Sequence, residues 1–587
     1  MRRLRARARS AWARLITWFN SREFSEYSIL LTFAVATGVL SALGVVAFYG
    51  TIDLAYAAFY KWPATFLAHV SFLAYRPLIT GAGLALAWWV MQRIGRGHDG
   101  MNVPDVQVAV VRRGADVPSR PAFARTLASA ITIGAGASAG SEGPVVVLGA
   151  AIASWLGRAF RFAAGRKTVL VGCATGAAIS AAFNAPLAGA FFALEEIVGT
   201  FSGASFAPVV VSSVVAAVVT RGIFGNHPAF PVPKEYGYAG VSEVLLFFPL
   251  LGLVCGAVAA LYVRSYFGAG DLARRLPVPR SALPWIGGAA VGILVFLTGG
   301  VLVGYGHLAV RVDVFGRMAW YALLGLTLGK IVATSITLNF GGSGGVFTPS
   351  LYIGAAAGGT VGVALAKLFP TLGLHPETYA LVGMGAMVAG ATDAPITGIL
   401  LVFEMTNDYA IVLPLMLTVV ISHAVARRLE PDSLYSGWLR RRGESMTQGA
   451  DSDVLAGLRV ADACDRVPFV ITEDMPLTSV LEDLARRGQS VAPVVDDAGA
   501  LVGMITTTDL GRAARAARDV DSLLLAADLA TPTETVALDD SLMEAIRRMG
   551  VRGANALPVT ERGTNRLLGV VSRAHVLAVY EQAVSQR

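Results

Sequence analysis

Charged side chains are scarce in this chain. They make up 15% of its 587 residues, whereas soluble domains carry roughly 25%. Hydrophobic residues account for 55%, a balance that excludes an ordinary soluble protein and predicts one embedded in a lipid bilayer. Several apolar stretches are too long for one span and others are expected to be re-entrant, so counting them does not give the number of spans.

Cysteine and histidine are scarce as well. The three cysteines, Cys173, Cys255 and Cys464, are scattered and odd in number, so they predict neither a disulfide framework nor a metal site. The apolar segments contain no HExxH sequence and no Ser/His or Cys/His combination typical of a catalytic site. We also expect no cleavable signal peptide, because the first apolar run starts too late and is too long.

One acid interrupts a long apolar segment. Glu142, in the sequence GSEGP, is the single charged residue among the 32 between Arg125 and Arg158. A carboxylate in hydrocarbon is costly unless a partner, a pathway or a proton compensates it, so this acid is a functional-site candidate. The alternative is a glutamate held by a helix N-terminus for packing alone. The flanking glycines and Pro144 predict a helix that begins inside the membrane.

A second segment repeats the first. The 36 residues between Lys330 and Lys367 carry no charge and contain GGVFTP. Four landmarks match at offsets of 205 or 209 positions: Pro144 with Pro349, Gly149 with Gly354, residues 184–189 with 393–398, and Glu195 with Glu404. Such duplicated halves predict a binding site near the midplane, where the N-termini of broken helices meet. Exposed N–H groups there suit an anion.

The composition changes after Glu430. Residues 444–587 hold 21 of the chain's 40 acidic residues and no run of membrane length, which predicts a soluble domain. This part is duplicated too, because VAPVV at 491–495 matches ALPVT at 556–560 and LVGMIT at 501–506 matches LLGVVS at 567–572. Each copy is predicted to run strand, helix, strand, turn, strand, helix.

Six arginines lie in the segment MRRLRARARSAWAR that opens the chain. We expect this segment to be a positive flank on the cytoplasmic side of the first span. An amphipathic or nucleic-acid-binding arm is the alternative.

Together, the ordered motifs resemble those of the CLC family of chloride channels and proton/chloride exchangers, over roughly residues 25–442. GSEGP resembles that family's central glutamate motif, GVFTP its partner motif, FNAPLAGAFFALEE the helix with its internal proton-transfer glutamate, and Leu434-Tyr435 its last-helix tyrosine. The C-terminal pair resembles a tandem of cystathionine-β-synthase (CBS) domains, which often hold adenine nucleotides. The resemblance implies a polytopic α-helical membrane protein with inverted internal repeats and broken helices, followed by an α/β tandem CBS domain.

The expected organisation follows from this resemblance. It comprises a basic cytoplasmic N-terminus over 1–24, a transmembrane domain over 25–442 with halves at roughly 25–225 and 240–442, a linker over 443–457, and CBS domains over 458–522 and 523–587. The resemblance also implies a multi-pass protein of the cell (inner) membrane, with both termini cytoplasmic. It further implies a homodimer with one pathway per subunit, no required cofactor, no metal and no nucleic-acid partner.

The resemblance assigns roles to single residues. Glu142 would be the gating glutamate, which occupies the anion path when ionised and swings away when protonated. Val346 and Phe347 would offer backbone N–H groups to the anion, Tyr435 its hydroxyl, and Glu196 would pass protons between Glu142 and the cytoplasm. From the residues alone, an acidic helix end explains Glu196 equally well, and interfacial anchoring explains Tyr435.

One motif departs from the family pattern. A GSGIP-like sequence is replaced by Gly100-Met101-Asn102-Val103-Pro104. Met101 therefore stands where a hydroxyl would donate to the central anion, and its thioether has no donor. Asn102 either supplies an amide donor or caps a helix. Chloride is the family default, while nitrate, fluoride or a loosely selective site stay open, and His98 and Asp99 are expected to be solvated loop residues.

In the soluble part, Thr506 and Asp509 resemble the CBS motif in which a hydroxyl and an aspartate bind the phosphate and ribose of an adenine nucleotide. The alternative for Asp509 is an N-cap of the following helix. The second copy has His575 in place of the aspartate, so at most one good nucleotide site is expected.

Three hypotheses for the function come from different classes. A coupled proton/anion exchanger is favoured because both Glu142 and Glu196 are present. A passive anion channel on the same fold, gated by voltage or ligand, is the second. A membrane enzyme regulated by the CBS pair is the third, and the missing catalytic motifs disfavour it.

Overall fold

The computed structural model describes residues 26–63, 75–95, 101–226, 236–238, 240–302, 318–444, 455, 457–466, 469–487, 491–506, 525–552 and 554–585. The chain forms two compact units, Met1–Met446 and Thr447–Arg587. Six of the described helices are long and apolar enough to cross a membrane, all in the first unit. Residues 1–24, His98, Asp99 and Asp509, which the sequence singled out, lie outside the described residues.

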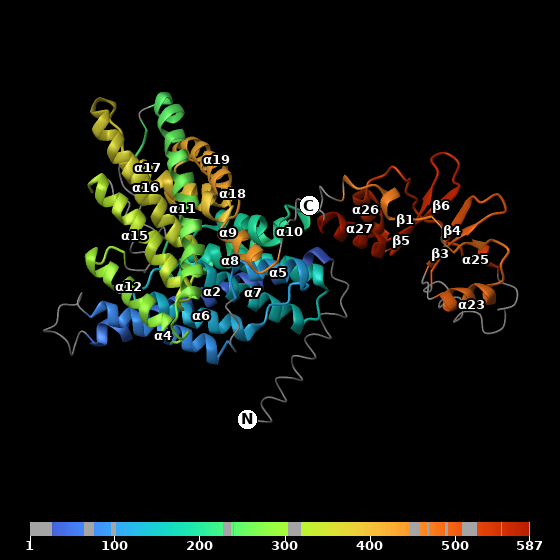
Figure 1. Cartoon of the computed structure of the whole chain (residues 1–587), viewed down its shortest axis with the longest axis horizontal. Coiled ribbons are helices and arrows are strands. Elements are labelled where there is room, and N and C mark those ends of the chain that lie inside the picture. Colours follow the sequence, from blue (N-terminus) through green and yellow to red (C-terminus); the bar gives the residue numbers. More distant parts are fainter. Residues whose placement is uncertain are drawn as a thin grey trace, which may run out of the picture. The chain divides into compact units, whose positions relative to one another are not determined.

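The first half of the membrane unit is blue to teal in Figure 1. Its elements are α2 (Glu26–Tyr56) and its π-helical continuation η1 (Ala57–Lys61), α4 (Arg76–Arg93), α5 (Val103–Arg112), α6 (Ser119–Gly134), α7 (Glu142–Ala159), α8 (Ala164–Phe183), α9 (Pro186–Phe192) and its π-helical continuation η2 (Ala193–Val198), and α10 (Gly203–Phe224).

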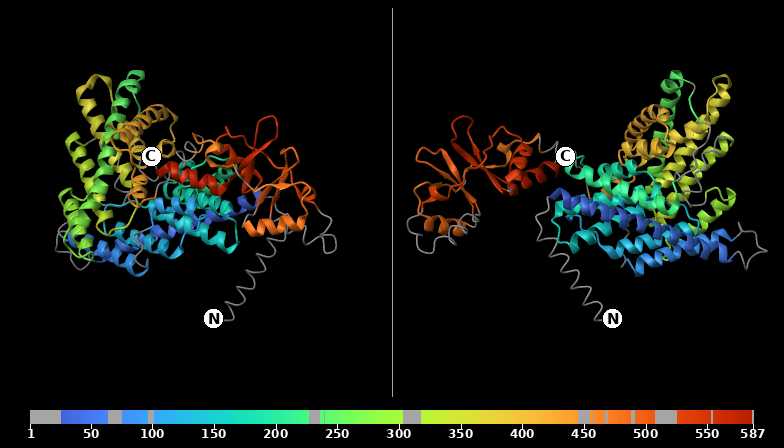
Figure 2. Two further views of the ribbon diagram at one scale, coloured as in Figure 1. Left: turned by 45° about the vertical axis from the view of Figure 1, so that its right-hand side comes forward. Right: turned by 180° about the vertical axis from the view of Figure 1, so that it is seen from behind.

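The second half is green to orange in Figure 1. Its elements are η3 (Glu243–Phe247), α11 (Phe248–Arg275), α12 (Leu283–Leu297), α15 (Trp320–Asn339), α16 (Phe347–Leu368), η4 (Pro370–Leu372), α17 (Pro376–Thr392), α18 (Pro395–Thr406), η5 (Tyr409–Ile411), α19 (Val412–Leu429) and α20 (Ser436–Arg441). Figure 2 shows the two halves packed side by side in both views.

Matched turns break the helices at the same place in each half. α8 ends at Asn184 with φ 56° and α17 ends at Asp393 with φ 74°. Asparagine and aspartate tolerate this left-handed conformation, which stops a helix. Pro186 and Pro395 then start the next helices, where the missing proline N–H costs nothing. The sequence pattern Asx-Ala-Pro thus produces two successive helices from one apolar run.

Buried hydroxyl pairs relate the halves by a two-fold exchange. Ser129 of the first half bonds Ser343 of the second at 2.8 Å between their Oγ atoms. Ser138 of the first half bonds Thr334 of the second at 2.8 Å. Ser343 lies 205 positions after Ser138, and Thr334 lies 205 positions after Ser129. Each hydrogen bond is therefore the image of the other with the two halves exchanged. A two-fold axis between the halves has this effect, as the inverted repeats of membrane transporters do.

The C-terminal unit is built from two three-stranded sheets. Their elements are α22 (Val460–Ala463), β1 (Cys464–Asp465), β2 (Ile471–Thr472), α23 (Leu477–Arg487), β3 (Val491–Val495), β4 (Leu501–Thr506), α25 (Ala526–Leu529), α26 (Leu542–Arg552), β5 (Ala556–Thr560), β6 (Leu567–Ser572) and α27 (Arg573–Ser585). One sheet has the order β2-β3-β4 and the other β1-β6-β5.

The two copies in this unit exchange residues near their starts. β1, at the start of the first copy, pairs antiparallel with β6 of the second copy, Cys464 opposite Val571. Conversely, Thr531, near the start of the second copy, pairs with Met504 of β4 in the first. Each sheet is therefore completed by residues from the start of the other copy, and the copies form one module.

Candidate functional site

The helices α7 and α16 begin at a junction between the two halves. The loops before them pair through two backbone hydrogen bonds of 2.8 Å, Gly140 N–H to the Gly345 carbonyl and Gly345 N–H to the Gly140 carbonyl. A Cβ atom at either glycine would overlap the Glu142 carboxylate. Glycine is therefore required at both positions for the acid to reach the junction.

The carboxylate of Glu142 binds the N-terminus of the opposite helix. Glu142 is the first residue of α7 and is 1% exposed. Its Oε1 accepts the backbone N–H of Phe347 at 2.6 Å and its Oε2 accepts the hydroxyl of Thr348 at 2.6 Å. Both donors lie in the first turn of α16, where N–H groups lack helical partners and the dipole favours negative charge. The side chain thus occupies a ready-made anion site.

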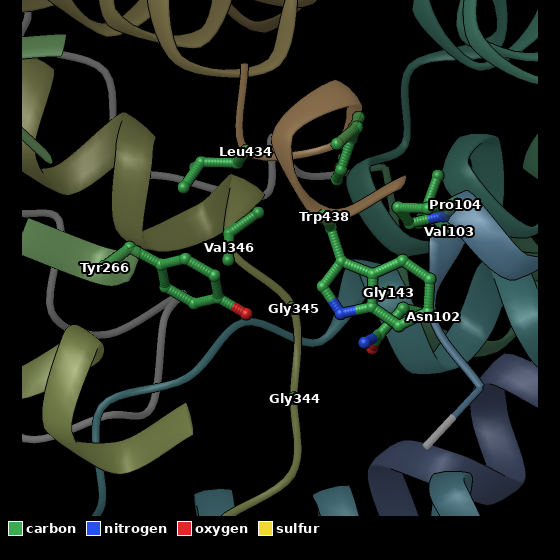
Figure 3. Close-up of a pocket in the computed structure, with 11 residues that line it drawn as sticks. Asn102, Val103, Pro104, Gly143, Tyr266, Gly344, Gly345, Val346, Leu434 and Trp438 are labelled. Carbon is green, nitrogen blue, oxygen red and sulfur yellow. The ribbon is translucent and has the colours of Figure 1, made fainter. Parts of the chain in front are cut away.

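A pocket lies beside this junction. Its lining residues come from the starts of α5, α7, α16 and α20 and from the middle of α11: Asn102, Val103, Pro104, Gly143, Tyr266, Gly344, Gly345, Val346, Leu434, Tyr435 and Trp438. In Figure 3 the Tyr266 hydroxyl points toward Gly345 and the Trp438 indole nitrogen toward Asn102. The pocket therefore combines aromatic walls with neutral hydrogen-bond donors, which bind an anion without a full opposing charge.

The structure gathers most of the predicted anion-site residues here. Asn102, Val346 and Tyr435 line the pocket, while Phe347 is fully buried and donates to Glu142. Met101 is 6% exposed and packs in the apolar core rather than in the lining. An anion-binding role for Met101 stays a prediction.

A buried arginine at the pocket was not foreseen as a site residue. Arg125 of α6 donates to the Gly344 carbonyl at 2.8 Å and to Oδ1 of Asn102. Asn102 is also the N-cap residue of α5, and its backbone N–H donates to the Asp105 carboxylate at 2.6 Å. Asn102 therefore begins the helix and also lines the pocket. Its role as an amide donor to the anion stays a prediction. Its side-chain N–H groups remain as donors once Oδ1 is held.

The neighbouring acids Glu195 and Glu196, in η2 after α9, contact different helices. Glu195 accepts the N–H groups of Ile396 and Thr397, at 3.0 and 2.9 Å, and so caps α18. Glu196 instead contacts α5, where Nε2 of Gln107 donates to its carbonyl at 2.7 Å and to its carboxylate at 3.1 Å. The helix-end explanation thus fits Glu195, whereas Glu196 faces the helix that begins at the pocket. Gln107 carried no signal in the sequence.

The nucleotide motif of the C-terminal module is described only in part. Thr506 is the last residue of β4, and Asp509 lies outside the described residues. In the second copy the matched residue, Ser572, accepts the backbone N–H of His575 at 3.2 Å and so caps α27. Within the described part of the chain, no three His, Cys, Asp or Glu side chains are grouped to hold a metal ion.

Comparisons with known proteins agree with this arrangement. The family model described as voltage gated chloride channel matches residues 83–427, and the CBS domain model matches residues 460–515 and 526–582. A putative chloride channel protein ClcB-like of Ralstonia nicotianae is 33% identical over 370 residues, which cover 62% of this chain and 86% of that protein. The H(+)/Cl(-) exchange transporter ClcA of Yersinia pseudotuberculosis is 30% identical over 435 residues, which cover 70% and 87%.

The fold is similar to that of a solved eukaryotic CLC transporter. The match covers 94% of this chain and 99% of that one, with a TM-score of 0.62 and 18% identity. The chain therefore belongs to the voltage-gated chloride channel (CLC) family, as a multi-pass membrane protein for anion transport, not an enzyme, with a C-terminal pair of CBS domains.

Proposed function

We propose that the protein is a proton/anion exchanger gated by Glu142. The hydrogen bond from Phe347 N–H to the Glu142 carboxylate carries this proposal, because it places a tethered anion on the donors that a free anion needs. Ionised Glu142 holds these donors, whereas protonated Glu142 loses its negative charge and leaves them. An anion then takes its place, so each anion that enters requires a proton on Glu142.

Glu196 is proposed as the internal proton relay. It lies on η2, held by Gln107 of α5, and α5 begins at the pocket. Protons thus have a route separate from the anions, and the two meet at Glu142. The similarity to the Yersinia exchange transporter also supports coupled transport.

We propose chloride as the default anion, with weak discrimination. Tyr435 and Val346, which line the pocket, are proposed to supply a hydroxyl and backbone N–H groups as neutral donors, but Met101 offers none. Met101→Ser should raise selectivity for chloride over nitrate in liposome flux assays, while Met101→Leu, which also lacks a donor, should not. A wild-type protein already strongly selective for chloride, with Met101→Ser neutral, would contradict this.

The termini are proposed to be cytoplasmic, in the inner membrane of the cell. Arginines gather at the membrane-domain end that carries α20, here called the α20 face. Among them Arg441 pairs with Asp271 at 2.9 Å and Arg264 with Glu430 at 2.9 Å. Excess arginine at one face predicts the cytoplasmic side.

A homodimer with one pathway per subunit is proposed from family membership. An adenine nucleotide is proposed to bind at Thr506 and Asp509, from the match to the CBS domain model.

Reconstitution into liposomes tests the exchanger. Purified protein given an anion gradient should move protons uphill. Glu142→Gln and Glu196→Gln should abolish proton movement and leave anion flux, whereas Glu377→Gln, a matched change at the start of α17, should alter neither. Uphill proton movement by Glu142→Ala would refute the assignment.

A passive anion channel is the second candidate, supported by the similarity to the ClcB-like putative channel. The same assay separates the two functions. A channel gives anion flux in the wild-type protein without any uphill movement of protons.

A further inference from the structure

Three side chains that the exchange mechanism leaves unused meet where α17 turns into α18. Nδ1 of His423, on α19, lies 3.4 Å from the Asp393 carboxylate and 3.4 Å from the Ala389 carbonyl. Arg427, one turn further along α19, lies 3.7 Å from the same carboxylate. The side chains of His423 and Asp393 are 32% and 44% exposed, so both reach the surface of the protein.

The fold does not require an acid at this corner. Asp393 ends α17 in the left-handed conformation, and the matched residue Asn184 ends α8 in the same conformation. Arg221 donates to Asn184 at 2.6 Å, much as Arg427 approaches Asp393. The first half therefore builds the turn with a neutral residue. The acid must have another use in the second half.

The corner lies beside the helix start that is capped by Glu195, the chain neighbour of Glu196. Glu195 accepts the N–H groups of Ile396 and Thr397, three and four residues after Asp393, so its carboxylate is occupied. The short stretch from Asp393 to Thr397 therefore connects the corner to the proposed relay. Arg427 gives hydrogen bonds to the carbonyls of Gly390 and Pro431, at 2.8 and 3.1 Å, so it neutralises Asp393 incompletely.

Two further carboxylates face Arg427 from the segment after α19, and both are paired. Glu430 is bound by Arg264 of α11 at 2.9 Å, and Asp432 is bound by Arg440 of α20. Asp393 is therefore the carboxylate at this corner that stays available to His423.

We propose that Asp393 and His423 form a proton-entry pair, which passes protons between solvent at the α20 face and Glu196. This deepens the exchanger function proposed above and rests on it. The Ala389 carbonyl only accepts, so it keeps the proton of the neutral ring on Nδ1. Nε2 then takes a proton from water, the hydroxide leaves to bulk solvent, and Asp393 stabilises the imidazolium. The proton leaves through water to the Glu196 carboxylate, which restores the neutral ring.

The test compares proton and anion fluxes of the full-length protein in liposomes, with equal pH on both sides. The variants are His423→Gln and Asp393→Asn, the latter supplying the residue that the matched corner already uses. The control is Asn184→Asp at that matched corner. At about pH 8 both variants should move protons roughly tenfold more slowly than the wild-type protein. This loss is smaller than that expected for a positioned proton-transfer group, because water also delivers protons without the pair. At about pH 5 they should approach the wild-type rate, since water then protonates Glu196 directly.

Each outcome decides the inference. Wild-type proton flux in both variants at both pH values would overturn the proton-entry pair and leave the exchanger intact. A wild-type protein that moves no protons uphill would overturn the exchanger, and the pair with it. Should His423→Gln lose anion flux as well, showing misfolding, the result for Asp393→Asn decides alone, because asparagine keeps the turn.

Discussion

Glu195 and Glu404 cap each other's neighbouring helices across the two halves of the membrane domain. Glu195, in η2 after α9, accepts the first N–H groups of α18, and Glu404, in α18, accepts those of α9 at 2.8 and 2.7 Å. The two acids lie 209 positions apart, so the exchange obeys the two-fold relation between the halves. The starts of α9 and α18 thereby each gain an anionic cap where water is scarce.

Replacing either acid by alanine should destabilise the membrane domain. Loss of an N-cap costs about 1 kcal/mol, and here each change leaves two backbone donors without a partner. The midpoint of thermal unfolding in detergent should fall for Glu404→Ala and for Glu195→Ala. Glu377→Ala, an acid at a helix start without this role across the halves, serves as control. Equal midpoints for all three variants would contradict the capping.

Much of the site was predictable because the chain is duplicated. The offset that pairs Pro144 with Pro349 located both broken helices, and the family motifs indicated Glu142 and Phe347. The sequence marks Arg125 as the end of an apolar segment, and Lys330 follows it by the same 205 positions. This spacing of 205 positions indicates that Arg125 and Lys330 both belong to the repeat. The structure shows both side chains buried.

Other features depend on tertiary packing and leave no local trace in the sequence. Tyr266 and Trp438 reach the pocket from α11 and α20, far apart in the chain. Gln107 faces Glu196 only because α5 packs against η2. The exchange of β1 between the CBS copies involves two residues, too few for any periodicity to reveal.

Adding a methyl group at the junction should uncouple transport. Gly345→Ala places a Cβ against the Glu142 carboxylate and so displaces it from the Phe347 N–H. We expect proton movement to fall close to the level of Glu142→Ala while anion flux persists. Gly222→Ala, in α10, meets no atom within 4 Å and should behave as wild type. Intact coupling in Gly345→Ala would show that the carboxylate has room elsewhere.

Removing the buried guanidinium should weaken anion binding. Arg125→Gln leaves the Gly344 carbonyl and the Asn102 side chain without their donor, and it removes the positive charge beside the pocket. A buried group left unpaired costs about 1–3 kcal/mol, so chloride affinity measured by calorimetry should drop roughly tenfold or more. Arg125→Lys should recover part of it, because one charge remains but the fork of donors is lost. Arg120→Gln, an exposed change on the same helix, should leave the affinity unchanged.

Nucleotide binding by the CBS module should alter the transport rate without altering the ratio of protons to anions. A ligand that prefers one conformation of the module shifts transport by that preference, typically about 1–3 kcal/mol. Calorimetry on the full-length protein in detergent should detect AMP, ADP, ATP or a cyclic dinucleotide, and Thr506→Val should abolish the signal. Ser572→Ala is the matched control, because that hydroxyl caps α27 and the second copy lacks the aspartate. If none of these nucleotides binds, the CBS module is better explained as a dimerisation scaffold. Deleting the module would then change the oligomeric state of the protein and leave no response to nucleotide to lose.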